Sequence, residues 1–139
     1  MGLTSRKSAC EHIDTNIIIR LITRDDPKMT KKAERLLAKK DKIYIFEDAA
    51  MMEVVFVLTG EYYHYDRDEA AASIMALSKI DNLYFNKGLI EEALNLYVGH
   101  PKLSFVDCYL AAATTLSGET PLWTCDHKLA TQCPVAQEL

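Results

Sequence analysis

Residues 43–59 read Ile-Tyr-Ile-Phe-Glu-Asp-Ala-Ala-Met-Met-Glu-Val-Val-Phe-Val-Leu-Thr, and this stretch decides the fold class. Its first four residues are β-branched and aromatic types that favour a strand. Asp48 is a suitable N-cap for a helix, and Gly60 can end that helix after about Thr59. A strand that passes directly into a helix is the repeating unit of α/β proteins.

The same alternation continues along the rest of the chain. We predict an α/β fold with a mostly parallel sheet, and a single domain over residues 1–139, because this length suits one hydrophobic core. The predicted strands are Ala9–Ile13, Ile43–Phe46, Asn82–Phe85, Leu122–Thr124 and a brief one near Val135. The predicted helices are Thr15–Thr23, Met29–Lys40, Asp48–Thr59, Glu69–Lys79 after a start at Asp66, Leu89–Val98, one from Ser104 to near Gly118, and a short turn from Asp126.

Composition points to an ordinary soluble protein. Apolar residues make up 49% of the chain and charged residues 26%, and no apolar run is long enough to cross a membrane. The segment Met1–Cys10 has no apolar core of a secretory signal, so a cytoplasmic location is expected. The four cysteines show no C-x₂-C spacing, which disfavours a zinc site, and a cytosolic context does not support a disulfide.

Positive charge is concentrated in one window although the net charge of the chain is −4. Between Arg20 and Lys42 there are nine basic residues against four acidic ones. Such a flank could contact backbone phosphates of a nucleic acid. The alternative is a solvated face of an amphipathic helix.

Four acidic residues occur where an apolar residue would fit better: Asp14, Glu53, Asp107 and Asp126. A carboxylate among core residues is costly unless it is compensated, and several carboxylates together resist ionisation without a counter-charge. Mg²⁺ or Mn²⁺ would supply that charge, since hard cations prefer oxygen donors. Asp14 and Asp126 each follow a predicted strand, and such strand ends meet at one edge of a parallel sheet. We therefore predict one metal site, with Asn16 and Thr124 as supporting residues.

Each of the four acids also has an explanation that involves no metal. Asp14 and Asp126 could cap the helices that follow them, and Ser104 with Asp107 resembles a capping box. Glu53 lies in mid-helix among apolar residues, where burial without a partner is rare and a salt bridge to lysine or arginine is the alternative. A single shared site explains all four positions together.

Taken as an ordered set, these motifs resemble the PIN domain. The matching segments are Asp14-Thr15-Asn16, the helix of Glu53, Ser104–Ala112 and Trp123–Ala130, and the stretch Arg20–Pro27 resembles toxin ribonucleases of the VapC type. The resemblance implies a Rossmann-like α/β/α sandwich, with Asp14, Glu53, Asp107 and Asp126 binding one or two Mg²⁺ or Mn²⁺ ions. It also implies RNA hydrolysis, a homodimer and a cognate antitoxin. Many relatives have a further acid at the position of Ser104.

Three functions compete on these residues. The first is a VapC-type, metal-dependent endoribonuclease in which an activated water attacks the phosphodiester. The second is a PIN-like module that binds RNA or protein without cleaving. The third is a phosphotransferase with Asp14 as nucleophile, which is disfavoured because Asn16 stands where such enzymes need a second acid.

Overall fold

The computed structural model describes residues 9–139 and divides the chain into two compact units, which meet between Asn86 and Lys87. We call them the N-terminal unit and the C-terminal unit and describe each by itself. The prediction that Met1–Cys10 is not a secretory signal concerns a segment that lies mostly outside the described residues. Within residues 9–139 no helix is both long and apolar enough to cross a bilayer.

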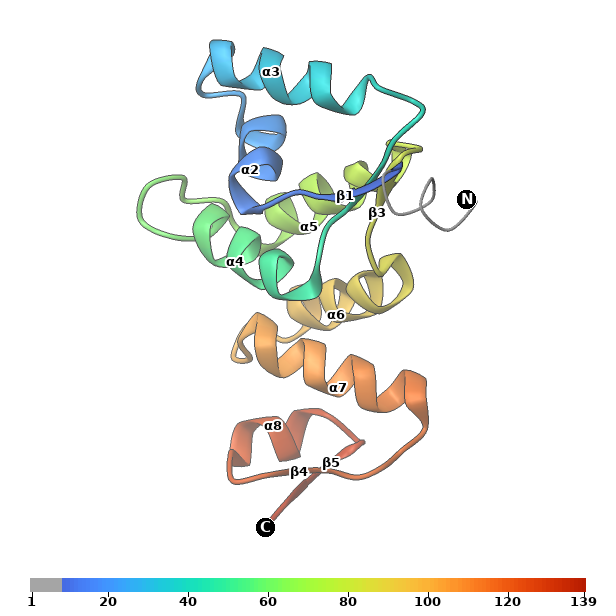
Figure 1. Ribbon diagram of the computed structural model, residues 1–139. Coiled ribbons are helices and arrows are strands. Elements are labelled where there is room, and N and C mark those ends of the chain that lie inside the picture. The colour runs from blue at the N-terminus through green and yellow to red at the C-terminus, as the bar shows by residue number, and fades with distance from the viewer. Residues whose placement is uncertain (1–8) are drawn as a thin grey trace. The chain divides into compact units, whose positions relative to one another are not determined.

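The N-terminal unit contains a three-stranded parallel sheet in the order β1-β2-β3 (Figure 1). Cys10 of β1 pairs with Ile43 of β2, and Tyr44 of β2 pairs with Leu83 of β3. Helix α2 packs against both α3 and α4. The elements are β1 (Cys10–His12), α2 (Thr15–Thr23), α3 (Pro27–Leu37), β2 (Ile43–Ile45), α4 (Asp48–Leu58), α5 (Arg67–Ala76), the 3₁₀ turn η1 (Leu77–Lys79) and β3 (Leu83–Tyr84).

The polar residues of β1 suit an exposed edge strand whose side chains contact residues on either side of β2. All three residues of β1 are exposed. Lys42 lies 3.5 Å from Glu11, and His12 lies 3.0 Å from Glu47. An exposed edge strand does not need the apolar sequence of a central one.

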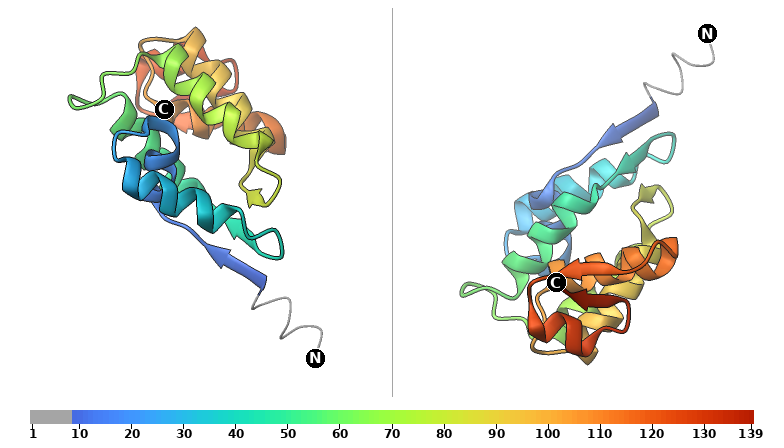
Figure 2. Two further views of the ribbon diagram at one scale, coloured as in Figure 1. Left: turned by 90° about the horizontal axis from the view of Figure 1, so that it is seen from above. Right: turned by 90° about the horizontal axis from the view of Figure 1, so that it is seen from below.

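The C-terminal unit contains a pair of packed helices and a two-stranded parallel sheet, β4-β5. Helices α6 and α7 run side by side (Figures 1 and 2). The rings of Tyr97 and Phe105 meet edge to face at 5.5 Å between centroids. The elements are α6 (Lys87–Gly99), α7 (Phe105–Ser117), β4 (Leu122–Thr124), α8 (His127–Gln132) and β5 (Ala136–Glu138).

The predicted α/β class with parallel strands is confirmed, with two sheets in the described chain, one in each unit. Helix α2 and strand β4 have the predicted bounds. Helix α3 begins earlier than predicted, at Pro27, because the Asp26 side chain accepts from the Met29 amide and proline suits the first helical position. Cys10, Cys108, Cys125 and Cys133 are free thiols.

Candidate functional site

Asp14 stands at the carboxyl end of β1, where the chain turns into α2. The pairing of β1 with β2 extends one residue beyond the strand, since the Ile13 amide donates to the Ile45 carbonyl at 3.0 Å. Asp14 occupies the N-cap position of α2, yet its side chain makes no capping hydrogen bond and is exposed. The capping explanation therefore does not account for its carboxylate.

Glu53 lies beside the start of α2. The hydroxyl of Thr15 donates to Glu53 Oε2 at 3.3 Å and lies 3.5 Å from the Ala50 carbonyl oxygen. Thr15 is buried, and its hydroxyl therefore links the start of α2 to the second turn of α4. The structure thus brings the segments of Asp14 and Glu53 together. Sequence reasoning did not single out Thr15, although its place directly after Asp14 was a usable signal.

The expectation that the acids are buried among core residues is wrong. Asp14 and Glu53 are exposed, and Asp107 and Asp126 are partly exposed. Helix α4 is almost entirely apolar in sequence, but Met51, Val54, Val55 and Leu58 take its buried positions. Among the described residues no lysine or arginine forms a salt bridge with Glu53, so that alternative receives no support.

Asp107 belongs to the first turn of α7 in the C-terminal unit. Ser104 caps this helix by accepting from the Asp107 amide at 3.1 Å. Because the serine supplies the cap, the Asp107 carboxylate is not needed for it. Burial raises the pKa of the Cys133 thiol, and the negative charge of Asp107 adds to that rise.

Asp126 caps α8, as its capping explanation predicted. Its Oδ1 accepts from the Lys128 amide at 2.9 Å. The Thr124 hydroxyl oxygen accepts from the Asp126 amide at 2.9 Å and so holds the turn that carries the carboxylate. The supporting roles of Thr124 and Asn16 toward the carboxylates stay predictions.

The four acids are divided equally, with Asp14 and Glu53 in the N-terminal unit and Asp107 and Asp126 in the C-terminal unit. Within either unit, over residues 9–139, no three His, Cys, Asp or Glu side chains are grouped to hold a metal ion. The donor chemistry fits Mg²⁺ or Mn²⁺, because every candidate ligand is a carboxylate oxygen. That all four bind one site stays a prediction.

A polar network ties the end of α2 to the loop after α4. Asp25 accepts from the Tyr63 hydroxyl at 2.7 Å, from Arg20 Nη1 at 2.8 Å and from the Thr23 hydroxyl at 2.9 Å. The Tyr63 and Thr23 hydroxyls, with Arg20, lower the pKa of the Asp25 carboxyl. Asp25 in turn orients the guanidinium of Arg20 and raises its pKa. Arg20 is therefore a fixed cation on α2.

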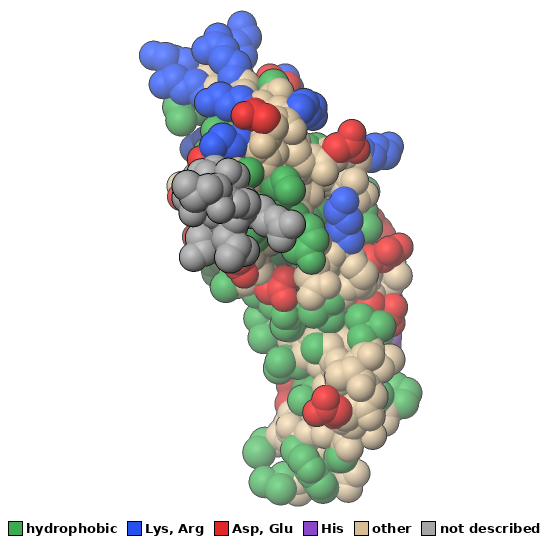
Figure 3. Space-filling model, turned by 45° about the vertical axis from the view of Figure 1, so that its right-hand side comes forward, with side chains coloured by type: hydrophobic (Ala, Val, Ile, Leu, Met, Phe, Trp, Pro, Cys, Tyr) green, Lys and Arg blue, Asp and Glu red, His purple; other side chains and the backbone are tan. Residues whose placement is uncertain are grey.

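Basic side chains gather over α3. Figure 3 shows lysine and arginine side chains concentrated at the top of the view, which is the end of the N-terminal unit where α3 lies. Its exposed cations are Lys28, Lys31, Lys32 and Arg35. The positive window predicted from the sequence is therefore solvent-accessible, which both the phosphate-contact and the solvated-face interpretations require.

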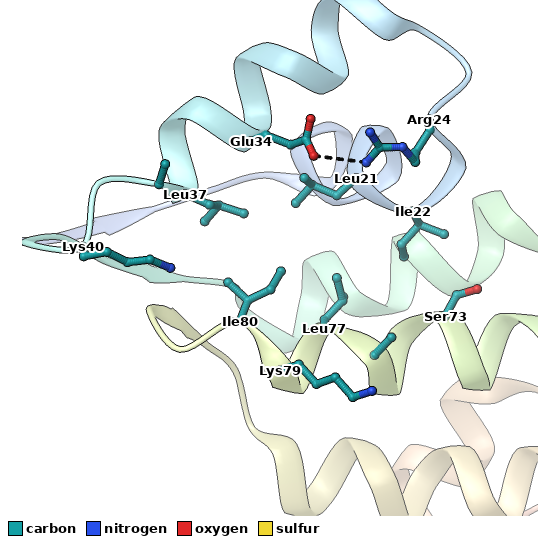
Figure 4. Close-up of a pocket in the computed structure, with 12 residues that line it drawn as sticks. Leu21, Ile22, Arg24, Glu34, Leu37, Lys40, Ser73, Leu77, Lys79 and Ile80 are labelled. Atoms are coloured by element: carbon teal, nitrogen blue, oxygen red, sulfur yellow. Dashed lines mark hydrogen bonds and ion pairs between the residues drawn. The ribbon is translucent and has the colours of Figure 1, made fainter.

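An apolar groove of about 710 Å³ lies between α2, α3 and the α5–η1 segment of the N-terminal unit. Leu21, Leu77 and Ile80 are among the apolar side chains that line it, as Figure 4 shows. At its edge Arg24 Nη1 lies 3.2 Å from Glu34 Oε2. The groove is thus mainly apolar, and Arg24 there already has a carboxylate partner.

Comparison with protein-family models gives one informative match. A model described as PIN domain matches residues 12–132, a span that contains all four acids. Comparisons with curated proteins and with solved structures gave no significant match.

Proposed function

Because the chain belongs to the PIN domain family, whose members are generally nucleases, we propose that it is a metal-dependent endoribonuclease. The observation that carries the proposal is the match over residues 12–132 together with the four acids inside it. Asp14, Glu53, Asp107 and Asp126 would be the catalytic and metal-binding residues. Asn16 and Thr124 would support them.

The donor set favours Mg²⁺ or Mn²⁺, as one ion or two. A divalent ion in such a site supplies positive charge to the phosphate oxygens and lowers the pKa of a bound water. Asp14, Asp107 and Asp126 would bear most of the coordination. Glu53 would accept the Thr15 hydrogen bond with one oxygen and face the ion or its water with the other.

We further propose that the protein acts as a VapC-type toxin, in the cytoplasm and as a homodimer, with a cognate antitoxin as its inhibitor. The groove between α2, α3 and α5 supports the proposal of a protein partner. Leucine and isoleucine side chains line it, and Lys40 and Lys79 lie at its edge (Figure 4). An amphipathic antitoxin segment with acidic flanks would match both features.

The test is cleavage of a labelled RNA mixture by the wild type and by Asp107→Asn, with Mg²⁺, Mn²⁺ or EDTA. We expect metal-dependent cutting that the substitution lowers by at least about a hundredfold, since the lost group would act in the transition state. Asp81→Asn is the matched control, because Asp81 is an exposed acid outside the four. A folded wild type that cuts none of several RNAs would favour a non-catalytic PIN-like module that binds RNA or protein.

A further inference from the structure

A second, smaller cleft lies between α2 and α3 in the N-terminal unit. Its volume is about 310 Å³, at the lower end of the range for small-ligand sites. Ile17 of α2 with Met29 and Leu36 of α3 supply its apolar lining. The polar lining residues are Asn16, Arg20 and Lys32. We call this the α2–α3 cleft.

The two cations of the cleft are suited to hold an anion. Asp25 engages Nη1 of Arg20, which leaves other N–H donors of the guanidinium for a ligand. Lys32 is exposed, and no carboxylate partner for it occurs among residues 9–139. An apolar lining beside two cations fits a ligand that combines an apolar surface with an anionic group, and a nucleotide has both.

The position of the cleft connects it to the candidate site. Asn16 lies two residues after Asp14, on the first turn of α2. Asn16 and Arg20 are four residues apart and therefore share one face of this helix. A polymer bound along that face would pass from Lys32 and Arg20 toward Asp14.

We propose that the α2–α3 cleft binds one nucleotide of the RNA strand next to the scissile phosphate. The base packs on Ile17, Met29 and Leu36, its edge faces the Asn16 amide, and the phosphate lies between Arg20 and Lys32. This inference rests on the proposed ribonuclease function, because it assigns a binding site for that substrate. The larger groove is not assigned to this nucleotide, because it is the groove proposed above for a protein partner.

The test compares Lys32→Ala with Lys31→Ala, which removes the same charge from the same helix at an exposed position outside the cleft. Both changes favour helix formation. The probe is a fluorescein-labelled ten-nucleotide RNA of mixed sequence, with EDTA present so that binding is measured without cleavage. We expect Lys32→Ala to weaken binding roughly three- to tenfold, as for the net loss of one ordinary hydrogen bond at a solvent-exposed site, and Lys31→Ala to weaken it less than about twofold.

A salt titration and a crosslinking experiment make the outcome specific. Loss of one phosphate contact should reduce the slope of log K against log salt by about 0.7 in Lys32→Ala. RNA that carries 4-thiouridine should crosslink to the segment 29–36 in the wild type.

Equal RNA binding by the two variants, with crosslinks outside the segment 29–36, would overturn the proposal that the cleft binds a nucleotide and would leave the proposed ribonuclease function standing. A wild type that neither binds nor cuts RNA would remove both proposals together.

Discussion

At the scale of single residues, Thr15 is the side chain on which the geometry of Glu53 depends. Its hydroxyl is a hydrogen-bond donor to Glu53 Oε2 and is held in a buried position. Thr15→Val keeps the shape and removes the donor, so the Glu53 carboxylate should become mobile. We expect cleavage to slow about fivefold, as for loss of one modest hydrogen bond, with little change in unfolding. Thr15→Ser keeps the hydroxyl and should cut at the wild-type rate, measured with the same labelled RNA.

The same residues show what sequence reasoning could reach in the site. The identity of the four acids came from their apolar neighbours, and the family match contains them all. The exposure of Glu53 could not be read from α4, because a helix that is apolar all round does not reveal which face is buried. The Thr15 contact depends on the register of β1 against β2, and that register is a tertiary property.

At the scale of elements, Asp25 pins the end of α2 to the loop that precedes α5. Its pKa is lowered chiefly by the Tyr63 hydroxyl. A carboxyl whose pKa falls on folding contributes stability that is present above its ordinary value of about 3.8 and is lost as the pH falls through the folded value. Tyr63→Phe should therefore lower stability by about 1 kcal/mol at pH 7. The difference from the wild type should shrink as the pH is lowered below 3.8 and through the folded pKa of Asp25.

Tyr62→Phe is the matched control for that substitution. Tyr62 packs edge to face on Tyr63 at 4.7 Å and is 81% exposed, and no bond joins it to Asp25 among the described residues. Urea denaturation at both pH values is the measurement. A Tyr62→Phe loss as large as that of Tyr63→Phe would assign the effect to the loss of a tyrosine hydroxyl in this loop in general, and not to the bond with Asp25.

Element bounds were predictable where a local signal decided them. Thr15–Thr23 and Leu122–Thr124 have their predicted limits. Helix α5 begins at Arg67, directly after the predicted start at Asp66, because Asp66 and Glu69 form a capping box. Asn82 Nδ2 donates to the Leu37 carbonyl at 3.0 Å, across 45 residues of sequence, and no local rule predicts such a contact.

At the scale of the whole molecule, the four acids predict how metal binding changes the melting temperature of the folded chain. The proposed metal site uses Asp14, Glu53, Asp107 and Asp126, so metal binding should depend on each of these acids. Any ligand that binds only the folded chain stabilises it by about 2.7 kcal/mol at one hundred times its Kd. For a chain of this size we expect Mn²⁺ to raise the Tm by about 10 °C.

Substitutions in either unit should remove that rise. Asp14→Asn and Asp126→Asn each take one carboxylate from a different unit. Asparagine can keep the cap that Asp126 makes, and Asp14 makes no capping hydrogen bond to lose. Both variants should melt near the wild type without metal and show little rise with Mn²⁺, whereas Glu119→Gln, at an exposed position, should keep the full rise. A variant of one unit that retained the wild-type shift would confine the ion to the acids of the other unit, because a shared site cannot lose a ligand from either side without losing affinity.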